Sequence, residues 1–504
     1  MSAWRTPRSR KVHASALESS AHPDSRPTQE IEQLKQENEK LRDKVAEQAK
    51  QIADLERQLA LRQQNSTTSS KPPSSDGLAG RPRERGRRKK SRRTPGGQLG
   101  HPGHCRPLVP PERVNQIVEV FPDVCRHCHH ALRARGRAVT GEPRRHQVTE
   151  LPPIDAHITE YQCPHVVCPA CGKTTQAPVP EDVDGQFGPQ LTALIAYLTV
   201  VCRVPRRLVQ GLLEGAWHIP ISLGSTQAAW EEASDAVAAP CQELQQALKQ
   251  QPVLNGDETG HRTHAEKRWL WAIVAPAFVV FRIAATRGAE VLVDLLGEVF
   301  AGVLCSDRWR PYQTYHHGAL QFCWAHFKRN LLGAQELAKT SEAARFCREA
   351  LALQARLFRL WYRFRGDPTA RGAPLTRAQL VDKVIPLQKK LFALGERYLD
   401  SPNNDVRHLA TALFVHHEKF FVFVHHEGVE PTNNRAERAL RTAVQWRKIM
   451  FGNRSDVGEV AVARLLTVTR TCQMQQLNAL AYLAAAIRCH RRRQAVASLL
   501  PQRL

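Results

Sequence analysis

Between residues 252 and 307 the chain changes from helical to β-type patterning, and the order of these elements constrains the fold. Three short apolar runs come first, PVLNGDE, RWLWAIVA and FVVFRIAA, followed by the helical pattern GAEVLVDLLGEVF and a last run, AGVLCSD. Short runs rich in β-branched and aromatic residues are typical of strands, so the predicted order is β, β, β, α, β. We expect a three-stranded meander whose first strand has the fourth strand as its other neighbour.

Two aspartates occupy equivalent places in this pattern. Asp257 is expected at the end of the first strand and Asp307 at the end of the fourth. Neighbouring strands would then bring two carboxylates to one edge of the sheet. A sheet of this order flanked by helices is the start of an RNase H-like α/β core. We assign residues 250–455 to this core and about 335–425 to a helical insertion within it.

A third acid is predicted after the insertion, in PTNNRAERALRTAVQWRKIMFG. Asn433, Glu437 and Arg441 are four residues apart and share one face of the predicted helix. By itself Glu437 would be read as an ion pair with Arg441, but together with the two aspartates a metal ligand is favoured. The rival acids lie beside these motifs but off the shared face or outside the helix: Glu258, Glu430 and Asp456.

Three such carboxylates are suited to chemistry at phosphorus. Two Mg2+ ions about 3.5 to 4 Å apart stabilise both the attacking and the leaving oxygen of an in-line displacement, and Mg2+ prefers carboxylate oxygen and water. We therefore expect Mg2+ or Mn2+ at Asp257, Asp307 and Glu437. The formal net charge of +24 favours a polyanionic partner, with nucleic acid ahead of a membrane surface. Arg441, Arg447 and Lys448 are predicted to contact DNA.

The N-terminal region, residues 1–64, contains a heptad pattern over residues 31–62. Leucine, isoleucine and valine recur at the two core positions, interrupted by Asn38 and Gln48, which weaken the seam and help to fix its register. A parallel coiled coil is predicted, and with it a homodimer or higher oligomer. The alternative is a single solvated helix with an incidental leucine stripe.

Residues 65–104 are rich in Ser, Pro, Gly and Arg and predict a disordered basic linker. Between Arg81 and Arg93 there are nine Lys or Arg residues and one acid, Glu84. Such a segment suits phosphate contacts, although a solubilising tail is the alternative. The predicted DNA-binding residues are Arg87, Arg88, Lys89, Lys90, Arg92 and Arg93.

Two CxxC pairs lie within residues 105–180, at Cys125 and Cys128 and at Cys168 and Cys171. Four thiolates suit a tetrahedral Zn2+, so a small zinc-ribbon-like domain with a structural zinc ion is predicted. The gap of 39 residues between the pairs is long, and other side chains are alternative ligands. These are Cys163, His127, His129, His130 and His165.

Residues 185–245 predict helix, helix, turn, helix, the outline of a helix-turn-helix. With Ser225 as N-cap of the last helix, Thr226, Gln227 and Trp230 would lie near a DNA groove. A plain helical connector is the alternative. Residues 456–504 predict a C-terminal helical element.

The N-terminus MSAWRTPRSR lacks the apolar core of a signal peptide, and no window has the ~18 apolar residues of a membrane span. We therefore expect no membrane partner and a cytoplasmic, nucleoid-associated protein. The thirteen cysteines suit reduced thiols and a metal better than disulfides.

Several ordered strings resemble the transposases of IS66-type bacterial insertion sequences: SSKPPSSDG, TPGGQLGHPGH, the paired CxxC segment, DETG, SDRWRPY, CWAHFKRN, TNNRAERALR and LNALAYL. The resemblance spans roughly residues 30–490 and implies a DDE triad, carried here by Asp257, Asp307 and Glu437. It also implies a helical insertion before the glutamate and small companion proteins. A wider group of transposases has a C-x-x-H pair after the second aspartate, here Cys323 and His326, for which a buried structural pair is one interpretation.

The expected function is therefore metal-dependent cleavage of a DNA strand at the element end and transfer of the freed 3′-hydroxyl to target DNA. Two alternatives stay open at this point. One is a DNA-binding regulator without catalysis, in which the acids form structural pairs. The other is an RNase H-like recombination nuclease that acts without regard to particular terminal sequences.

Overall fold

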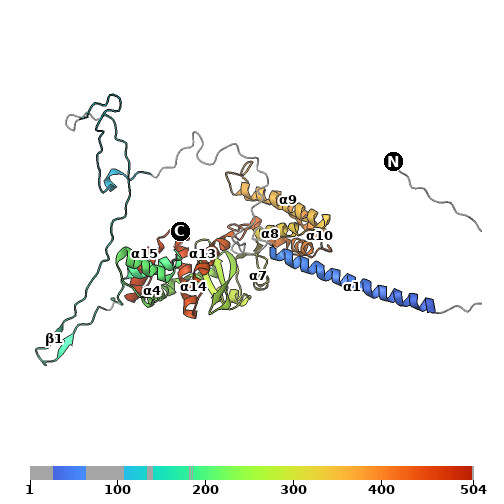
Figure 1. Ribbon diagram of the computed structural model, residues 1–504, viewed down its shortest axis with the longest axis horizontal. Helices are drawn as coiled ribbons and strands as arrows, with labels where there is room; N and C mark the ends of the chain where they lie inside the picture. Colours follow the sequence, from blue (N-terminus) through green and yellow to red (C-terminus); the bar gives the residue numbers. More distant parts are fainter. Residues whose placement is uncertain (1–25, 64–106, 133–139, 181–182, 184, 502–504) are drawn as a thin grey trace, which may run out of the picture.

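The structure is a computed structural model that describes residues 26–63, 107–132, 140–180, 183 and 185–501 (Figure 1). At its centre is a five-stranded sheet with the strand order β5-β4-β3-β6-β7. The strands are β3 (Val253–Thr263), β4 (Glu266–Val274), β5 (Val279–Ala284), β6 (Val303–Ser306) and β7 (Leu320–Phe322). β3, β4 and β5 form an antiparallel meander, whereas β6 runs parallel to both β3 and β7.

This topology confirms the predicted order of the first five elements. The helix α6 (Glu290–Leu296) connects β5 to β6, and β6 lies beside β3 with Val253 opposite Val303. The prediction that Asp257 ends the first strand was wrong, because β3 continues to Thr263 and pairs with β4 along its whole length. The segment HRTHAEKR has no apolar alternation that would indicate a strand. It nevertheless forms the outer end of this hairpin, with His264 and Ala265 at positive φ in the turn.

The exposed edge of the sheet at β5 is covered by the helix α14 (Asp456–Met474). The hydroxyl of Thr467 accepts a hydrogen bond from the backbone N–H of Phe281 at 2.9 Å, and the Thr471 hydroxyl accepts one from Val279 at 3.2 Å. An uncovered edge strand presents free N–H groups to other chains. Two threonines one helical turn apart thus accept hydrogen bonds from backbone N–H groups of β5 that have no neighbouring strand.

The segment predicted as an insertion is helical. It follows α8 (Trp324–Glu336) and consists of α9 (Ser341–Phe364), α10 (Arg377–Arg397), α11 (Asn404–Val415), η3 (His417–Phe420) and α12 (Val422–His425). Its buried side chains belong to the same continuous hydrophobic core as the sheet. The orange helices in Figure 1 therefore pack onto the α/β core through apolar contact.

Residues 185–245 form four helices, α2 (Pro189–Val200), α3 (Arg206–Trp217), α4 (Leu223–Ala236) and α5 (Ala238–Leu248). The first, α2, and the third, α4, pack against the C-terminal helix α15 (Ala479–Arg491). The predicted cap was wrong, because Ser222 caps α4 by accepting a hydrogen bond from the backbone N–H of Ser225. Thr226 and Trp230 are buried, so they face the protein core and no DNA groove.

Two parts of the chain contribute no buried side chain among their described residues, although Glu56 of the first forms an ion pair with Lys339 at 2.6 Å. The helix α1 (Arg26–Gln63) projects from the core in Figure 1 and exposes its apolar heptad side chains, including Leu34 at 59% and Leu55 at 63%. Almost every described residue from 107 to 180 is exposed; this segment contains η2 (Pro111–Arg113) and the hairpin of β1 (His165–Val167) and β2 (Thr174–Gln176). The predicted linker, with its basic arm Arg81 to Arg93, is outside the described residues. Every described helix is too short or too polar to span a lipid bilayer.

Candidate active site

The three predicted carboxylates come from three separate elements that meet beside β3. Asp257 is on β3, Asp307 directly follows β6, and Glu437 is in the first turn of α13 (Asn434–Met450). Burial, the charge of Glu258 and the charges of Asp307 and Glu437 raise the pKa of Asp257 well above its ordinary value. Asp307 and Glu437 are therefore each near enough to act electrostatically on Asp257, although the oxygens of the three carboxylates do not all lie within 4.8 Å of one another in the described structure.

Asn433, at the N-cap of α13, fixes this helix to the sheet. Its side chain is completely buried and donates a hydrogen bond to the backbone oxygen of Gly256 at 2.7 Å. Its Oδ1 accepts a second hydrogen bond from the side chain of Asn255 at 2.9 Å. These bonds reach the two residues before Asp257, so the first turn of α13, with Glu437, faces this strand. Arg441, one turn further along, is exposed.

Asp307 is held by the backbone that follows it. The N–H of Trp309 donates a hydrogen bond to Asp307 Oδ1 at 2.8 Å. Burial raises the pKa of Asp307, while this hydrogen bond and the guanidinium groups of Arg287, Arg308 and Arg329 act in the opposite direction. The carboxylate is thus fixed in place while remaining only partly covered.

The rival acid Glu258 is committed to a different set of partners. Its side chain points to the opposite face of β3 from Asp257, because successive residues of a strand alternate. There it accepts hydrogen bonds from Tyr312 on α7 (Arg310–Tyr315) at 2.5 Å and from Arg287 at 2.6 and 2.8 Å. Gly256 makes room for this arrangement, because a Cβ there would lie 2.9 Å from the Tyr312 ring.

Sequence reasoning assigned no role to Arg287 or Tyr312, although Tyr312 ends the string SDRWRPY that begins next to Asp307. Arg287 also links two indoles: its guanidinium lies 4.8 Å from the Trp269 ring and 4.1 Å from the Trp309 ring. Trp309 remains 40% exposed, two residues from Asp307. The candidate site therefore has an exposed aromatic ring beside it, and a cation–π contact with Arg287 helps to fix this ring in place.

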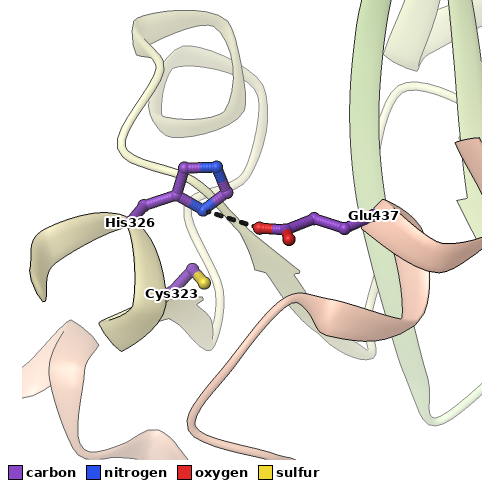
Figure 2. A group of neighbouring side chains, drawn as sticks. All are labelled: Cys323, His326 and Glu437. Atoms are coloured by element: carbon purple, nitrogen blue, oxygen red, sulfur yellow. Dashed lines mark ion pairs between the residues drawn. The ribbon is translucent and has the colours of Figure 1, made fainter. Parts of the chain in front are cut away.

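Glu437 has two basic neighbours on α8. Arg329 donates a hydrogen bond to Glu437 Oε1 at 2.8 Å, and His326 Nδ1 lies 3.4 Å from the same oxygen. Figure 2 shows His326 pointing toward Glu437, with Cys323 below it. Cys323 is buried, as the structural interpretation of the C-x-x-H pair requires, but the pair also adjoins the candidate site.

The remaining rival acids have other roles. Glu430 is paired with Arg365 at 2.8 Å. Asp456 is largely exposed and lies 4.0 Å from His264. Arg447 contacts the site from the far end of α13, with Nη1 3.5 Å from the Thr259 hydroxyl on the same face of β3 as Asp257.

Each predicted zinc-binding pair adopts a tight turn. The N–H of His129 donates to the Cys125 carbonyl and the N–H of Gly172 donates to the Cys168 carbonyl, both at 2.9 Å, with φ of 59° and 71° at the two donors. Hydrogen bonds from backbone N–H groups lower the pKa of Cys125 and Cys168, which favours the thiolate that a metal requires. The four thiols do not form one cluster within the described segments.

Comparison with known proteins identifies the family. Residues 184–461, more than half of the chain, match the family described as transposase IS66 family. The chain belongs to the IS66 family of transposases. The matched range begins at α2 and ends within α14, so it contains all five strands of the central sheet and the three carboxylates of the candidate site.

Two further matches concern parts of this IS66 family member. Residues 20–107 match a family of unknown function, DUF6444, over the region of α1 and the basic arm. An uncharacterized protein, y4qI, from Sinorhizobium fredii (strain NBRC 101917 / NGR234) is 25% identical over 242 residues. The alignment covers 44% of this chain and 43% of that relative, so the chain spans less than half the length of the relative it matches.

Proposed function

We propose that this IS66 family member cleaves a DNA strand at the ends of its element and joins the freed 3′-hydroxyl to target DNA, using Asp257, Asp307 and Glu437 as metal ligands. One observation carries the proposal. Three carboxylates from distant parts of the chain converge beside β3, and the charges of the other two act on Asp257. Asp257 does not serve as a partner in a structural ion pair. Among the described contacts, its side chain accepts one hydrogen bond, from the backbone N–H of Glu258 at 3.0 Å.

The sheet supports an RNase H-like interpretation of the core. Three antiparallel strands form one side of the sheet, two parallel strands form the other, and the first strand in sequence is central. In this arrangement the centre of β3 and the carboxyl end of β6 are adjacent. The same arrangement is what the sequence pattern predicted for a pair of neighbouring aspartates.

The donor set fits Mg2+ or Mn2+. All three side chains offer hard oxygen ligands, and mutual repulsion among carboxylates is relieved when a divalent cation neutralises them. Bound ions would supply charge stabilisation for the attacking and leaving oxygens at phosphorus. The chain's own contribution is positional: Asn433 orients the turn bearing Glu437, and Trp309 N–H orients Asp307.

Cationic and aromatic side chains on the elements that carry the acids are suited to contact with a DNA strand. Arg447 and Lys448 on α13 offer phosphate contacts, and the exposed face of Trp309 suits stacking with a base. Arg441 is exposed on the same helix. We assign the basic arm to non-specific DNA binding, α1 to assembly of a homodimer or higher oligomer, and the two CxxC turns to one structural Zn2+.

The test is cleavage and joining of a DNA duplex that carries the element end, in Mg2+. Asp257→Asn, Asp307→Asn and Glu437→Gln should each lower the rate at least about 100-fold, the scale on which loss of one charge-stabilising group acts. Glu430→Gln, which removes a carboxylate paired with Arg365 elsewhere, should retain activity. Retained cleavage by all three site variants would contradict the proposal, and cleavage indifferent to the terminal sequence would favour a nuclease.

A further inference from the structure

A second group of potential metal ligands adjoins the three carboxylates. Cys323 Sγ, one ring nitrogen of His326 and a Glu437 carboxylate oxygen all lie within 4.8 Å of one another (Figure 2). Among the described residues, this is the one group of three or more His, Cys, Asp or Glu side chains that meets this geometry. Its donors differ from those of the Asp257 and Asp307 pair, because they include sulfur and nitrogen.

Local structure explains why the three donors converge. Cys323 is the N-cap of α8 and His326 lies in its first turn, so a spacing of three places both side chains on one side of the helix. The backbone N–H of Asn433 donates a hydrogen bond to Cys323 Sγ at 3.1 Å. This bond joins α8 to the start of α13, which brings Glu437 to face the pair.

His326 has an unused ligand atom at this site. Its Nδ1 is buried and makes no hydrogen bond, although Glu437 Oε1 is only 3.4 Å away. A buried polar atom without a partner is unusual in a folded protein and calls for an explanation such as a bound ion.

Arg329 opposes a cation at this position. Its guanidinium donates to the same Glu437 oxygen at 2.8 Å and would repel an incoming ion. The Arg329 side chain is 23% exposed, so it has a route toward solvent. Metal binding and the Arg329 ion pair therefore compete for Glu437.

We propose that Cys323, His326 and Glu437 form a binding site for a borderline-soft divalent cation of the Zn2+ type, and that filling this site withdraws Glu437 from Asp257 and Asp307. Thiolate and imidazole ligands select Zn2+ over Mg2+, and three protein ligands leave one tetrahedral position for water. Binding releases the Cys323 thiol proton to solvent. The inhibitory half of this inference rests on the proposed function, whereas the binding half does not.

The binding half is tested by counting zinc in the full-length protein after equilibration with buffered Zn2+ alone. His326→Gln and Cys323→Ser should each bind about one fewer ion per chain than the wild type. Cys472→Ser, which changes another buried cysteine, should bind as many as the wild type. Arg329→Gln should bind more tightly, because it removes the competing cation. Circular dichroism checks the fold of each variant, and His326→Gln decides the question if Cys323→Ser is unfolded.

Substitution with Co2+ gives a second readout, since a thiolate ligand produces a charge-transfer band that Cys323→Ser should weaken and Cys472→Ser should not. Equal zinc counts in the wild type, His326→Gln and Cys323→Ser would overturn the site.

For the inhibitory half, Zn2+ added to an Mg2+ cleavage reaction should slow the wild type at least about tenfold more than His326→Gln. Equal inhibition would overturn that half. A wild type that never cleaves DNA would refute the proposed function while leaving the zinc counts valid.

Discussion

At the scale of single residues, the contrast between Asp257 and Glu258 defines the site. Both are acids on one strand, yet Glu258 forms an ion pair with Arg287 and accepts a hydrogen bond from the Tyr312 hydroxyl. Asp257 has no cationic partner in the described contacts, and its pKa is raised by burial and by the charges of the neighbouring carboxylates, Glu258 first and then Asp307 and Glu437. Such an unbalanced carboxylate costs stability when no cation is bound, which is typical of a functional residue.

The raised pKa of Asp257 predicts a pH-dependent stability in metal-free buffer. The folded state holds this proton more tightly than the unfolded state, so stability falls as pH rises from the ordinary Asp pKa of 3.8 toward the raised value. At neutral pH, Asp257→Asn should therefore raise the melting temperature by roughly 2–4 °C for each 1 kcal/mol of relieved repulsion. The measurement is thermal unfolding with EDTA.

In Mg2+ the wild type should instead melt at a higher temperature than Asp257→Asn, because the ion stabilises only the protein that keeps its ligands. The control is Asp456→Asn, whose side chain is 81% exposed and whose melting temperature should not change. A metal-free Asp257→Asn protein that melts below the wild type would be evidence against charge repulsion at this position.

Asn433 is the residue on which the position of Glu437 depends. Asn433→Ala removes the hydrogen bonds to Gly256 and Asn255 and leaves buried groups without partners, at a cost of about 1–3 kcal/mol. DNA cleavage should fall more than this loss of stability explains, because the first turn of α13 is no longer fixed to β3. The measurements are denaturant unfolding and single-turnover cleavage.

Asn434→Ala provides the matched control, since Asn434 is the next residue in the same turn and is exposed. It should leave both stability and cleavage close to wild type. Equal cleavage by Asn433→Ala and wild-type protein would mean that the hydrogen bonds of Asn433 to β3 do not position Glu437.

At the scale of elements, local patterns predicted the strand order and the helix of Glu437 because each depends on short-range periodicity. The extension of β3 beyond Asp257 was missed, since the outer hairpin carries the polar residues His261 to Lys267 and lacks an apolar pattern. Trp230 is buried in a core that α4 shares with α14 and α15, which are more than 200 residues further along the chain and cannot be seen in a local window.

The same distinction applies to the candidate site. The three acids stand in recognisable strings, whereas Arg287 and Tyr312 reach Glu258 only through the fold. Their roles follow from the adjacency of β3 and α7, and no spacing along the sequence reveals it. Asn433 is an intermediate case. The sequence predicted that it shares a helical face with Glu437, but it did not predict the hydrogen bonds of Asn433 to β3.

The heptad helix α1 carries a prediction about assembly. Its seam residues are exposed in the single chain, including Leu41 at 53%, and a coiled coil would bury them. Leu41→Asp should weaken association by about 2 kcal/mol or more, as loss of a buried leucine does. The measurement is molar mass against concentration by light scattering.

Lys40→Asp is the matched control, because it places the same acid on α1 at an outward-facing heptad position away from the seam. It should leave the molar mass unchanged. An unchanged molar mass in Leu41→Asp would argue against assembly through these heptads.

At the scale of the whole molecule, an excess of 24 positive charges predicts that DNA binding is strongly dependent on salt. Each phosphate contact contributes a slope of about −0.9 to the logarithmic dependence of affinity on salt concentration. Replacing the basic arm residues Arg87, Arg88, Lys89, Lys90, Arg92 and Arg93 by Gln should flatten this slope by several such contacts. Fluorescence anisotropy over a salt series measures it. An unchanged slope would assign DNA binding to other parts of the chain.

The whole molecule combines an α/β core, an inserted helical unit and N-terminal segments around one cluster of carboxylates. The most direct test of the central claim is Mn2+ binding to this cluster, followed by electron paramagnetic resonance in the full-length protein without DNA. Asp257→Asn, Asp307→Asn and Glu437→Gln should each lower Mn2+ affinity at least about tenfold, since each removes a hard oxygen ligand. Glu459→Gln, which changes an acid paired with Arg268, should bind Mn2+ as the wild type does. Wild-type Mn2+ affinity in all three site variants would contradict the account.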